Sequence, residues 1–325
     1  MNDAPQISFQ SHQFNDYDPE QLREVINGAD MEHTILASGR CSAKVQHFQS
    51  RRLAVNWGFY KFPVVARGQF PAGKISIGVS WGKRVSAWSN GSVLDRADVQ
   101  VYGEDTDLLY RAGAGTGWLV VVVDREQLQQ ESLDRLGREL PLPSGGSWNL
   151  SVPHRFARQV VDLILTTGRQ FDTLTGDREI ADHSILAACV DAITVGADSA
   201  QLSAIEERSG HRYDLIRRAD TAMRCLVGSK YSSAQLCRHL GVTERKLQLH
   251  FKEAIGLTPN AWFQRLALNR AHAELVRRQP SYSLVTEVAL DCGFEHLGRF
   301  AKSYRELFGK SPSTTVRDCR GRKCR

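Results

Sequence analysis

The chain has 325 residues, with 42 Lys and Arg against 36 Asp and Glu, which gives a formal net charge of +6. This length predicts about two domains, and no run of 18 apolar residues occurs that would span a membrane. The seven cysteines are odd in number and lack zinc-ligand spacing, and the N-terminal MNDAPQISFQ is unlike a secretory signal. We therefore expect a cytoplasmic protein without a metal site or cofactor.

The charge is divided unevenly along the chain. Residues 211–325 contain 22 basic and 10 acidic residues, a net of +12, which leaves residues 1–210 with 20 basic and 26 acidic residues, a net of −6. A basic domain of this size is typical of proteins that bind the phosphate backbone of a nucleic acid. A solvated basic surface explains the same charge equally well.

The first 150 residues are predicted to form β-strands. RLAVNWGFY (52–60) and KISIGVSW (74–81) alternate apolar side chains, and GWLVVVVD (117–124) is a continuous apolar run, typical of a strand buried on both faces. Turn sequences such as SNGS separate the strands, which favours an antiparallel sandwich or small barrel. PLPSGGSWN (141–149) is the clearest candidate for a loop or linker.

The segment after residue 150 shows helical periodicity. Two amphipathic helices are predicted within residues 154–171 and 180–196, each with apolar side chains at helical spacing. The polar, glycine-containing segment 203–212 is a second linker candidate, and from Tyr213 onward the pattern is helical almost throughout.

The C-terminal region contains a first helix-turn-helix pattern. Ser232 can cap a short helix, Gly241 permits a tight turn, and Thr243 can cap a second helix. Gly256 stands where that second helix would end in a left-handed conformation. Thr258 with Pro259 then begins another helix, since proline at a first helical position loses no hydrogen bond. A short helix, a glycine turn and a second amphipathic helix predict a helix-turn-helix.

A second copy of this pattern lies about fifty residues later. Gly293 occupies the turn, Gly309 the end of the second helix, and Ser311-Pro312 a new start. Between the copies, residues 261–278 read as one long helix that would hold the two units at a fixed separation. Because successive major-groove faces recur about 34 Å apart, two such units can read one face of a DNA duplex.

The side chains on the two second helices that point away from the apolar stripe are predicted to contact DNA. Arginine suits guanine and glutamine suits adenine, whereas lysine is as well suited to phosphate. Solvated helix-face charge is the alternative explanation. The predicted contacts are Arg245, Gln248, Leu249 and Lys252 on the first helix and His296, Arg299 and Lys302 on the second.

Across residues 213–312 the chain resembles the AraC/XylS family of bacterial transcription regulators. The second unit carries the most specific match, at Glu287, Ala289, Gly293, Phe294, Phe300, Gly309 and Pro312. The chain departs from the family pattern at Ala267, where a basic residue is usual, in STTVRD (313–318), which has no aromatic residue, and at Leu297-Gly298, where polar base readers are common.

The resemblance implies a β-rich N-terminal domain that binds an effector, followed by helices that dimerise. It assigns Val160, Leu165 and Ile185 to such a helical interface, although a stripe of this width commonly packs on its own sheet. Trp57, Trp81 and Trp88 are candidates for a ligand pocket, with His33, His47 and Trp118 as weaker ones. Core packing is the more common role of strand aromatics.

We therefore expect an α+β protein of two domains. The first, a β-rich sandwich or barrel with following helices, spans residues 1–205, and the second, an all-α double helix-turn-helix DNA-binding domain, spans 206–325. Within it the first unit covers about 232–256, the linker helix 259–278 and the second unit about 284–309.

The expected function is that of a sequence-specific transcription activator rather than an enzyme. Its expected partners are double-stranded DNA, RNA polymerase, a small-molecule effector and a second copy of the chain. A regulator controlled by dimerisation or a protein partner, without an effector, is the alternative. A DNA alkyl-transfer repair protein is a remote third hypothesis, because it needs clustered N-terminal cysteines and only Cys41 precedes residue 189.

Overall fold

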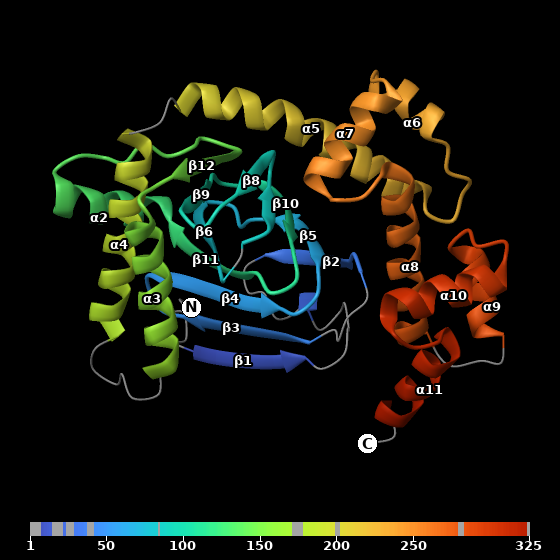
Figure 1. Ribbon diagram of the computed structural model, residues 1–325. Coiled ribbons are helices and arrows are strands. Elements are labelled where there is room, and N and C mark those ends of the chain that lie inside the picture. Colours follow the sequence, from blue (N-terminus) through green and yellow to red (C-terminus); the bar gives the residue numbers. More distant parts are fainter. Residues whose placement is uncertain are drawn as a thin grey trace.

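The computed structural model describes residues 8–14, 22–23, 29–37, 42–83, 85–170, 178–198, 202–278 and 283–323. Two β-sheets form the N-terminal part and helices form the C-terminal part (Figure 1), which confirms the α+β fold. The strands are β1 (Ser8–Phe14), β2 (Asp30–Ile35), β3 (Ala43–Gln49), β4 (Leu53–Tyr60), β5 (Val64–Gln69), β6 (Lys74–Trp81), β7 (Ala87–Ser89), β8 (Ser92–Leu94), β9 (Asp98–Tyr102), β10 (Asp107–Ala112), β11 (Gly117–Asp124) and β12 (Ser147–Ser151).

The helices follow in two groups. Three accompany the sheets: α2 (Arg125–Leu136), α3 (His154–Gln170) and α4 (Arg178–Asp198). The remaining helices are α5 (Leu202–Leu226), α6 (Ser233–Leu240), α7 (Glu244–Ala254), α8 (Pro259–Arg277), α9 (Leu284–Asp291), α10 (Leu297–Phe308) and α11 (Pro312–Lys323).

The larger sheet has the strand order β1-β3-β4-β11-β6-β9-β12, and the smaller sheet the order β2-β5-β10-β7-β8. β11 pairs antiparallel with β4 and β6, in the interior of the larger sheet. Its unbroken apolar run agrees with this position, because both of its faces are covered. The three strands predicted from hydrophobic patterns thus occur as β4, β6 and β11.

Helices α3 and α4 cover the outer face of the larger sheet (Figure 1). Ile75, Ile77 and Val79 of β6 pack on this side with Val160 and Ile185 of the helices, and all five side chains are buried. The assignment of Val160 and Ile185 to a dimer interface is therefore wrong, because both are enclosed between the helices and their own sheet. Leu165 is partly buried against the same cluster.

Among the described residues, one helical stretch, Glu179–Asp198, has the length and composition of a membrane span. It is 61% buried inside the protein. A core helix that packs against a sheet and other helices passes the same test, so the stretch is weak evidence for a membrane. We read it as the apolar helix that covers the sheet.

The first predicted linker is a loop over most of its length, and the second lies within a helix. The segment 141–149 ends in β12, whose Ser147 pairs with Tyr102 of β9, so this strand extends the larger sheet. The segment 203–212 lies inside α5, which runs from the sheets into the C-terminal helices (Figure 1). Local composition predicted a loop or linker in both places, and residues 141–146 do form a loop. Strand pairing instead decides residues 147–149, and helix continuation decides 203–212. Helix α2, directly after β11, was not predicted.

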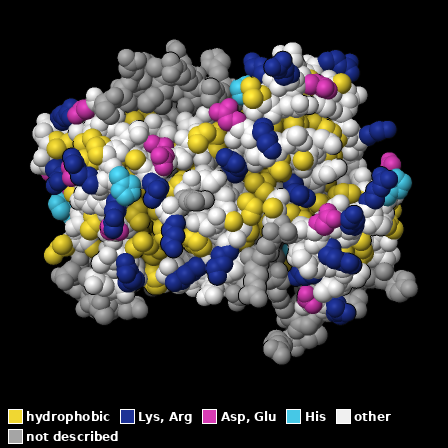
Figure 2. All heavy atoms as spheres, in the orientation of Figure 1, with side chains coloured by type: hydrophobic (Ala, Val, Ile, Leu, Met, Phe, Trp, Pro, Cys, Tyr) yellow, Lys and Arg dark blue, Asp and Glu magenta, His cyan; other side chains and the backbone are white. Residues whose placement is uncertain are grey.

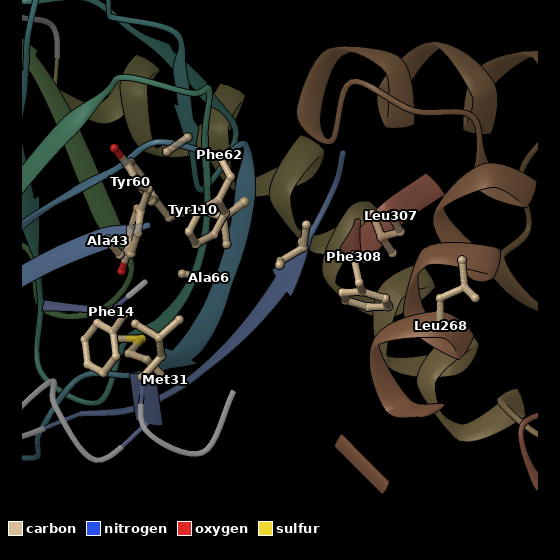
Figure 3. Packing of buried hydrophobic residues seen from close by; sticks show 14 of the residues in the cluster. Phe14, Met31, Ala43, Tyr60, Phe62, Ala66, Tyr110, Leu268, Leu307 and Phe308 are labelled. Carbon is tan, nitrogen blue, oxygen red and sulfur yellow. The ribbon is translucent and has the colours of Figure 1, made fainter. Parts of the chain in front are cut away.

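The outer face of the smaller sheet is covered by the C-terminal helices. Val65, Trp88 and Leu109 of this sheet form one buried cluster with Ile216 of α5 and Trp262 of α8. Another cluster extends from the space between the sheets to α8 and α10: Figure 3 shows Tyr60 and Tyr110 among the strands and Leu268, Leu307 and Phe308 among the helices. The two parts of the chain therefore share apolar cores.

Candidate nucleic-acid interface

The first helix-turn-helix unit consists of α6 and α7. The Ser232 Oγ accepts a hydrogen bond from the Gln235 N–H at 3.4 Å, and the Thr243 Oγ1 accepts one from the Lys246 N–H at 3.3 Å. Gly241 between the helices has φ 68°, a left-handed conformation that side chains disfavour. Gly256, with φ 81°, ends the unit. Local sequence signals thus predicted each boundary.

The second unit consists of α9 and α10, with Gly293 at φ 86° in the turn and Gly309 at φ 72° at the end. Phe300, Tyr304 and Leu307 of α10 are buried, as the helical spacing predicted. His296 precedes α10 without a side-chain capping bond, unlike Thr243 before α7. The start of α10 therefore has no capping side chain.

Helix α8 connects the two units as predicted. The Thr258 Oγ1 accepts a hydrogen bond from the Ala261 N–H at 3.3 Å, and Pro259 opens the helix. Ala267 is buried against the first unit. The position where the family usually has a basic residue thus faces the core of this protein and not a phosphate. Helix α11 packs on α8 without an aromatic residue, through Val316 and a Thr315 hydroxyl that accepts a hydrogen bond from Tyr304 at 2.9 Å.

All seven residues predicted to contact DNA have exposed side chains. They are Arg245, Gln248, Leu249 and Lys252 on α7, and His296, Arg299 and Lys302 at the start of α10 and along it. Leu249 is 65% exposed, a large fraction for an apolar side chain on a packed helix. Figure 2 shows Lys and Arg side chains spread over the C-terminal helices on the right of the view.

Ion pairing distinguishes other arginines of this region from the predicted DNA contacts. Arg278 bonds to Glu274 and Asp291, and Arg224 bonds to Asp220 and Glu32. Within the described part of the chain, no ion pair engages the cations predicted to contact DNA, which are Arg245, Lys252, Arg299 and Lys302. Their charge is therefore available to an anionic partner.

A cleft of about 730 Å³ lies between the second unit, α8 and the segment that joins α5 to α6. Lys230 and Tyr231 line it from the segment before α6, Gln264 from α8, and His296 and Arg299 from the second unit. Two of the predicted contacts, His296 and Arg299, thus face a hollow beside the second unit. Lys230 and Gln264 were not predicted, and only the placement of α8 beside the second unit brings them to it.

The N-terminal part binds α8 through the edge strand β2. The Asn269 Oδ1 accepts a hydrogen bond from the Ile35 N–H at 2.9 Å, and its Nδ2 donates to the Ile35 carbonyl at 3.1 Å. The Arg265 Nε donates to the Leu36 carbonyl at 2.8 Å. Two side chains of the linker helix thus satisfy backbone groups at the edge of the smaller sheet.

A buried carboxylate joins α5 to the same region. Asp220, 1% exposed, accepts hydrogen bonds from the Trp262 Nε1 at 2.9 Å and the Arg224 Nε at 2.8 Å. Its other partner is Arg67 of β5, with 3.2 Å between the charged atoms. A buried charge requires such partners, so Asp220 ties α5, α8 and the smaller sheet together.

The three tryptophans predicted to form a ligand pocket lie in separate places. Trp57 packs between β4 and α3, against Gly168, and Trp88 packs under the C-terminal helices. Trp81 lines a shallow hollow beside α3. Since none of them lines the cavity between the sheets, the fold does not build one pocket from all three.

Two weaker candidates, His33 and Trp118, do line a cavity between the sheets, and His47 does not. Burial lowers the pKa of the His33 imidazole to about 4, so the ring is neutral at pH 7. A sequence signal for this cavity existed in KISIGVSW, where Ser76, Gly78 and Ser80 alternate with the apolar residues. Gly78 and Ser80 line the cavity, whereas Ile75 and Ile77 pack in the cluster that includes the helices.

Among the described residues, no group of three His, Cys, Asp or Glu side chains is arranged to hold a metal ion. Cys41, on which the repair hypothesis depended, and Cys324 lie outside the described residues. Burial raises the pKa of the Cys292 thiol to about 11, so the thiol remains protonated at pH 7.

The family comparison matches the C-terminal helical region. Residues 236–318 match the helix-turn-helix domain family. The "Probable thc operon regulatory protein" of Rhodococcus erythropolis is 29% identical to this chain over 225 residues, which are 67% of each chain. The XylDLEGF operon transcriptional activator of Pseudomonas putida is 39% identical over 79 residues, 24% of this chain and 25% of the relative.

Two solved structures match different shares of the chain. A probable AraC family transcriptional regulator from Rhodopseudomonas palustris is 29% identical, with a TM-score of 0.30, over 33% of this chain and 97% of that one. The AraC-like transcriptional activator CuxR is 12% identical, with a TM-score of 0.40, over 82% of this chain and 96% of that one.

Two helix-turn-helix units on one linker helix, together with the matching domain family, define a DNA-binding domain. The protein is thus a DNA-binding transcriptional regulator. Its C-terminal region is an AraC-type helix-turn-helix domain, similar to those of the regulators named above.

Proposed function

We propose that the protein activates transcription by reading two adjacent major-groove segments with α7 and α10. The observation that carries this proposal is the set of exposed, unpaired basic and amide side chains on these two helices. Arg245 and Arg299 would pair with guanine, and Gln248 with adenine. Lys252 would bind phosphate, and its contribution would be the same on any sequence. The names of the P. putida relatives favour an activator.

The test begins with genome-wide mapping of the bound DNA, which defines the operator. The Arg299→Ala variant is then compared with Arg305→Ala, an exposed arginine in the last turn of the same helix. If Arg299 pairs with a guanine, its loss weakens operator binding by about 1–3 kcal/mol, roughly 5- to 150-fold, and leaves binding to random DNA nearly unchanged.

Three outcomes separate the explanations. An equal loss on operator and random DNA would identify Arg299 as a phosphate contact. An equal loss in Arg299→Ala and Arg305→Ala would show a general effect of charge. Unchanged operator binding in Arg245→Ala and Arg299→Ala together would remove α7 and α10 from the role of recognition helices.

We further propose that residues 1–205 regulate the DNA-binding region 206–325, with α5 shared between them. The contacts of Asn269 and Asp220 support this division of labour, because they connect the sheets to the linker helix and the first unit. RNA polymerase and a second copy of the chain are the proposed protein partners, and the cytoplasm is the proposed location. The dimer surface would lie outside the buried faces of α3 and α4.

A small-molecule effector is favoured over control by a protein partner alone. The specific observation is the cavity between the sheets, whose lining includes buried His33, Tyr60 and Tyr110. A thermal-shift screen of metabolites tests this choice, since a ligand that binds only the folded protein raises Tm. A broad screen without any stabilising compound would favour the partner alone.

A further inference from the structure

The cavity between the two sheets has an unusual lining for a sandwich interior. The described residues around it come from both sheets, and Figure 3 shows four of them, Met31, Tyr60, Ala66 and Tyr110, on the inner side of the strands. Aromatic rings form much of the wall, and polar groups are set among them. The polar and aromatic lining residues are His33, Asn56, Tyr60, Phe70, Ser80, Gln100, Tyr102, Tyr110 and Trp118.

Alternation along β6 explains why polar groups are enclosed there. Its apolar residues face the helices, so Ser76, Gly78 and Ser80 face inward. A side chain at Gly78 would meet the Gln100 Oε1 at 3.1 Å and the Tyr102 ring at 3.2 Å from its Cβ. Glycine at this position keeps open a space that any larger residue would narrow.

Two buried polar atoms at or near this space lack a partner in hydrogen-bond geometry. The Trp118 Nε1 lines the cavity and interacts with the Tyr60 hydroxyl only outside that geometry, and the residue is only 8% exposed. The Ser76 Oγ is fully buried, without a partner, on a residue paired with Tyr102 of the cavity wall. Native proteins rarely leave such groups unsatisfied, so these atoms indicate an occupant with hydrogen-bonding capacity.

The tyrosines of the wall are held in place by other side chains. The Tyr60 hydroxyl lies 2.9 Å from the His33 Nε2, and the Tyr110 hydroxyl lies 2.9 Å from the Ser80 Oγ. The Tyr102 hydroxyl lies 2.7 Å from the Ser89 Oγ. These bonds fix the rings before any ligand arrives, which lowers the entropy lost on binding.

The lining carries no formal charge among the described residues. It contains no Asp, Glu, Lys or Arg, and His33 is neutral as shown above. Burial also raises the pKa of the Tyr110 hydroxyl to about 12, so the phenol stays protonated. An ionised ligand would lose its hydration here without meeting an opposite charge, which makes binding of a carboxylate or an ammonium group unfavourable.

The cavity volume is about 60 Å³. One water molecule requires roughly 10–15 Å³ of such space, so the cavity exceeds a single-water site several times. It is far below the roughly 300 Å³ at the lower end of pockets that accept drug-sized ligands. A ligand of a few heavy atoms fits the described walls, and one small ring marks the upper limit.

We propose that this cavity binds a small uncharged organic molecule, mostly apolar, with one hydrogen-bond acceptor directed at the Trp118 indole N–H. The corresponding carboxylate is excluded. The idea that such a ligand controls transcription rests on the proposed function, whereas binding itself does not.

Two matched pairs of probes test the proposal on the full chain: butanamide against butyrate, and benzamide against benzoate. Each pair keeps size and shape, and the acid carries a negative charge where the amide carries its N–H donors. At about a hundred times Kd, a binding amide is expected to raise Tm by roughly 5–10 °C, and the acid at the same concentration to leave it unchanged. Isothermal titration then measures Kd directly. Acids that bind as well as the amides, or two amides that fail to bind, would overturn the proposal.

Variants locate the binding. Trp118→Phe removes the indole N–H and leaves the bound acceptor unsatisfied, so it is expected to weaken amide binding at least about fivefold, the lower end of that cost. Trp81→Phe, the same change outside the cavity, is its control and should leave Kd unchanged. Ala66→Ile fills the cavity and should abolish binding while its circular dichroism spectrum stays native. Full binding by Ala66→Ile would contradict the location.

Operator binding, measured in the same variants without ligand, separates this proposal from the proposed function. Intact operator binding with failed amide binding would refute only the ligand class. Amide binding that leaves operator affinity and transcription unchanged would confirm the site and refute effector control.

Discussion

The contact between Asn269 and the edge of β2 provides the sharpest test of how the two parts of the protein are joined. Asn269 is 8% exposed, and its amide exchanges hydrogen bonds with both backbone groups of Ile35. Replacing it by leucine keeps a side chain of similar size and removes both bonds. The Ile35 N–H and carbonyl are then left buried without these partners.

The magnitude follows from the two backbone groups. A typical hydrogen bond contributes about 0.5–1.5 kcal/mol, and a buried group left unsatisfied costs about 1–3 kcal/mol. Both backbone groups of Ile35 lose their partner in Asn269→Leu, and each is expected to relax in part. We therefore expect the substitution to weaken the docking of α8 on β2 by about 2–4 kcal/mol. This corresponds to a roughly 30- to 1,000-fold larger population of the undocked state.

Hydrogen exchange at the Ile35 amide measures this population directly, because that N–H donates to the Asn269 Oδ1. Its exchange rate is expected to rise by the same factor in the variant. Asn260→Leu is the matched control, since Asn260 is exposed in the first turn of the same helix. Amides in the centre of β11 should keep their protection in both variants.

Two results would refute this reasoning. Unchanged exchange at Ile35 in Asn269→Leu would show that apolar packing alone holds the interface. An equal rise in Asn260→Leu would show that any substitution on α8 loosens it.

Three further predictions concern stability. Because the folded-state pKa of His33 is about 4 and that of an unfolded histidine is about 6.5, the unfolded chain binds the proton first. Stability is therefore lost as pH falls from about 6.5 to 4, by up to about 3 kcal/mol, and urea titrations should show a smaller loss in His33→Gln. Tyr304→Phe removes the hydroxyl that lies 2.6 Å from the His272 Nδ1 and should cost about 1–2 kcal/mol in the same assay. Gly309→Ala, at φ 72°, should destabilise by about 1 kcal/mol, whereas Gly298→Ala, inside α10 with open space around it, should stabilise by about 0.5–1 kcal/mol; stabilisation by both would contradict the backbone argument.

The helix-turn-helix units were predictable because their signals are local. Ser232, Thr243 and Thr258 cap the helices that follow them, and Gly241 and Gly256 adopt left-handed conformations. Each of these outcomes depends on the residue itself and a neighbour within four positions. The same holds for the exposure of the predicted DNA contacts, which follows from helical periodicity.

The cavity and its chemistry were predicted poorly, because strand aromatics alone do not reveal which face of a sheet is enclosed. The tryptophans were the visible signal, yet Trp57 and Trp88 pack against helices that come later in the chain. The small residues between the apolar ones of β6 mark the cavity instead. They acquire that meaning only when the second sheet closes over them.

The sequence by itself determined the two reading units, the linker helix and the strands with strong hydrophobic patterns, since these depend on contacts between near neighbours. Only the tertiary structure decided that 141–149 contributes an edge strand and that α3 and α4 cover a sheet. It alone joined Ile35 to Asn269, 234 positions apart, because burial and edge pairing depend on which distant segments meet. The physical reason is that a cap or a turn is satisfied by its own backbone, whereas a sheet edge or a cavity wall is completed by another part of the chain.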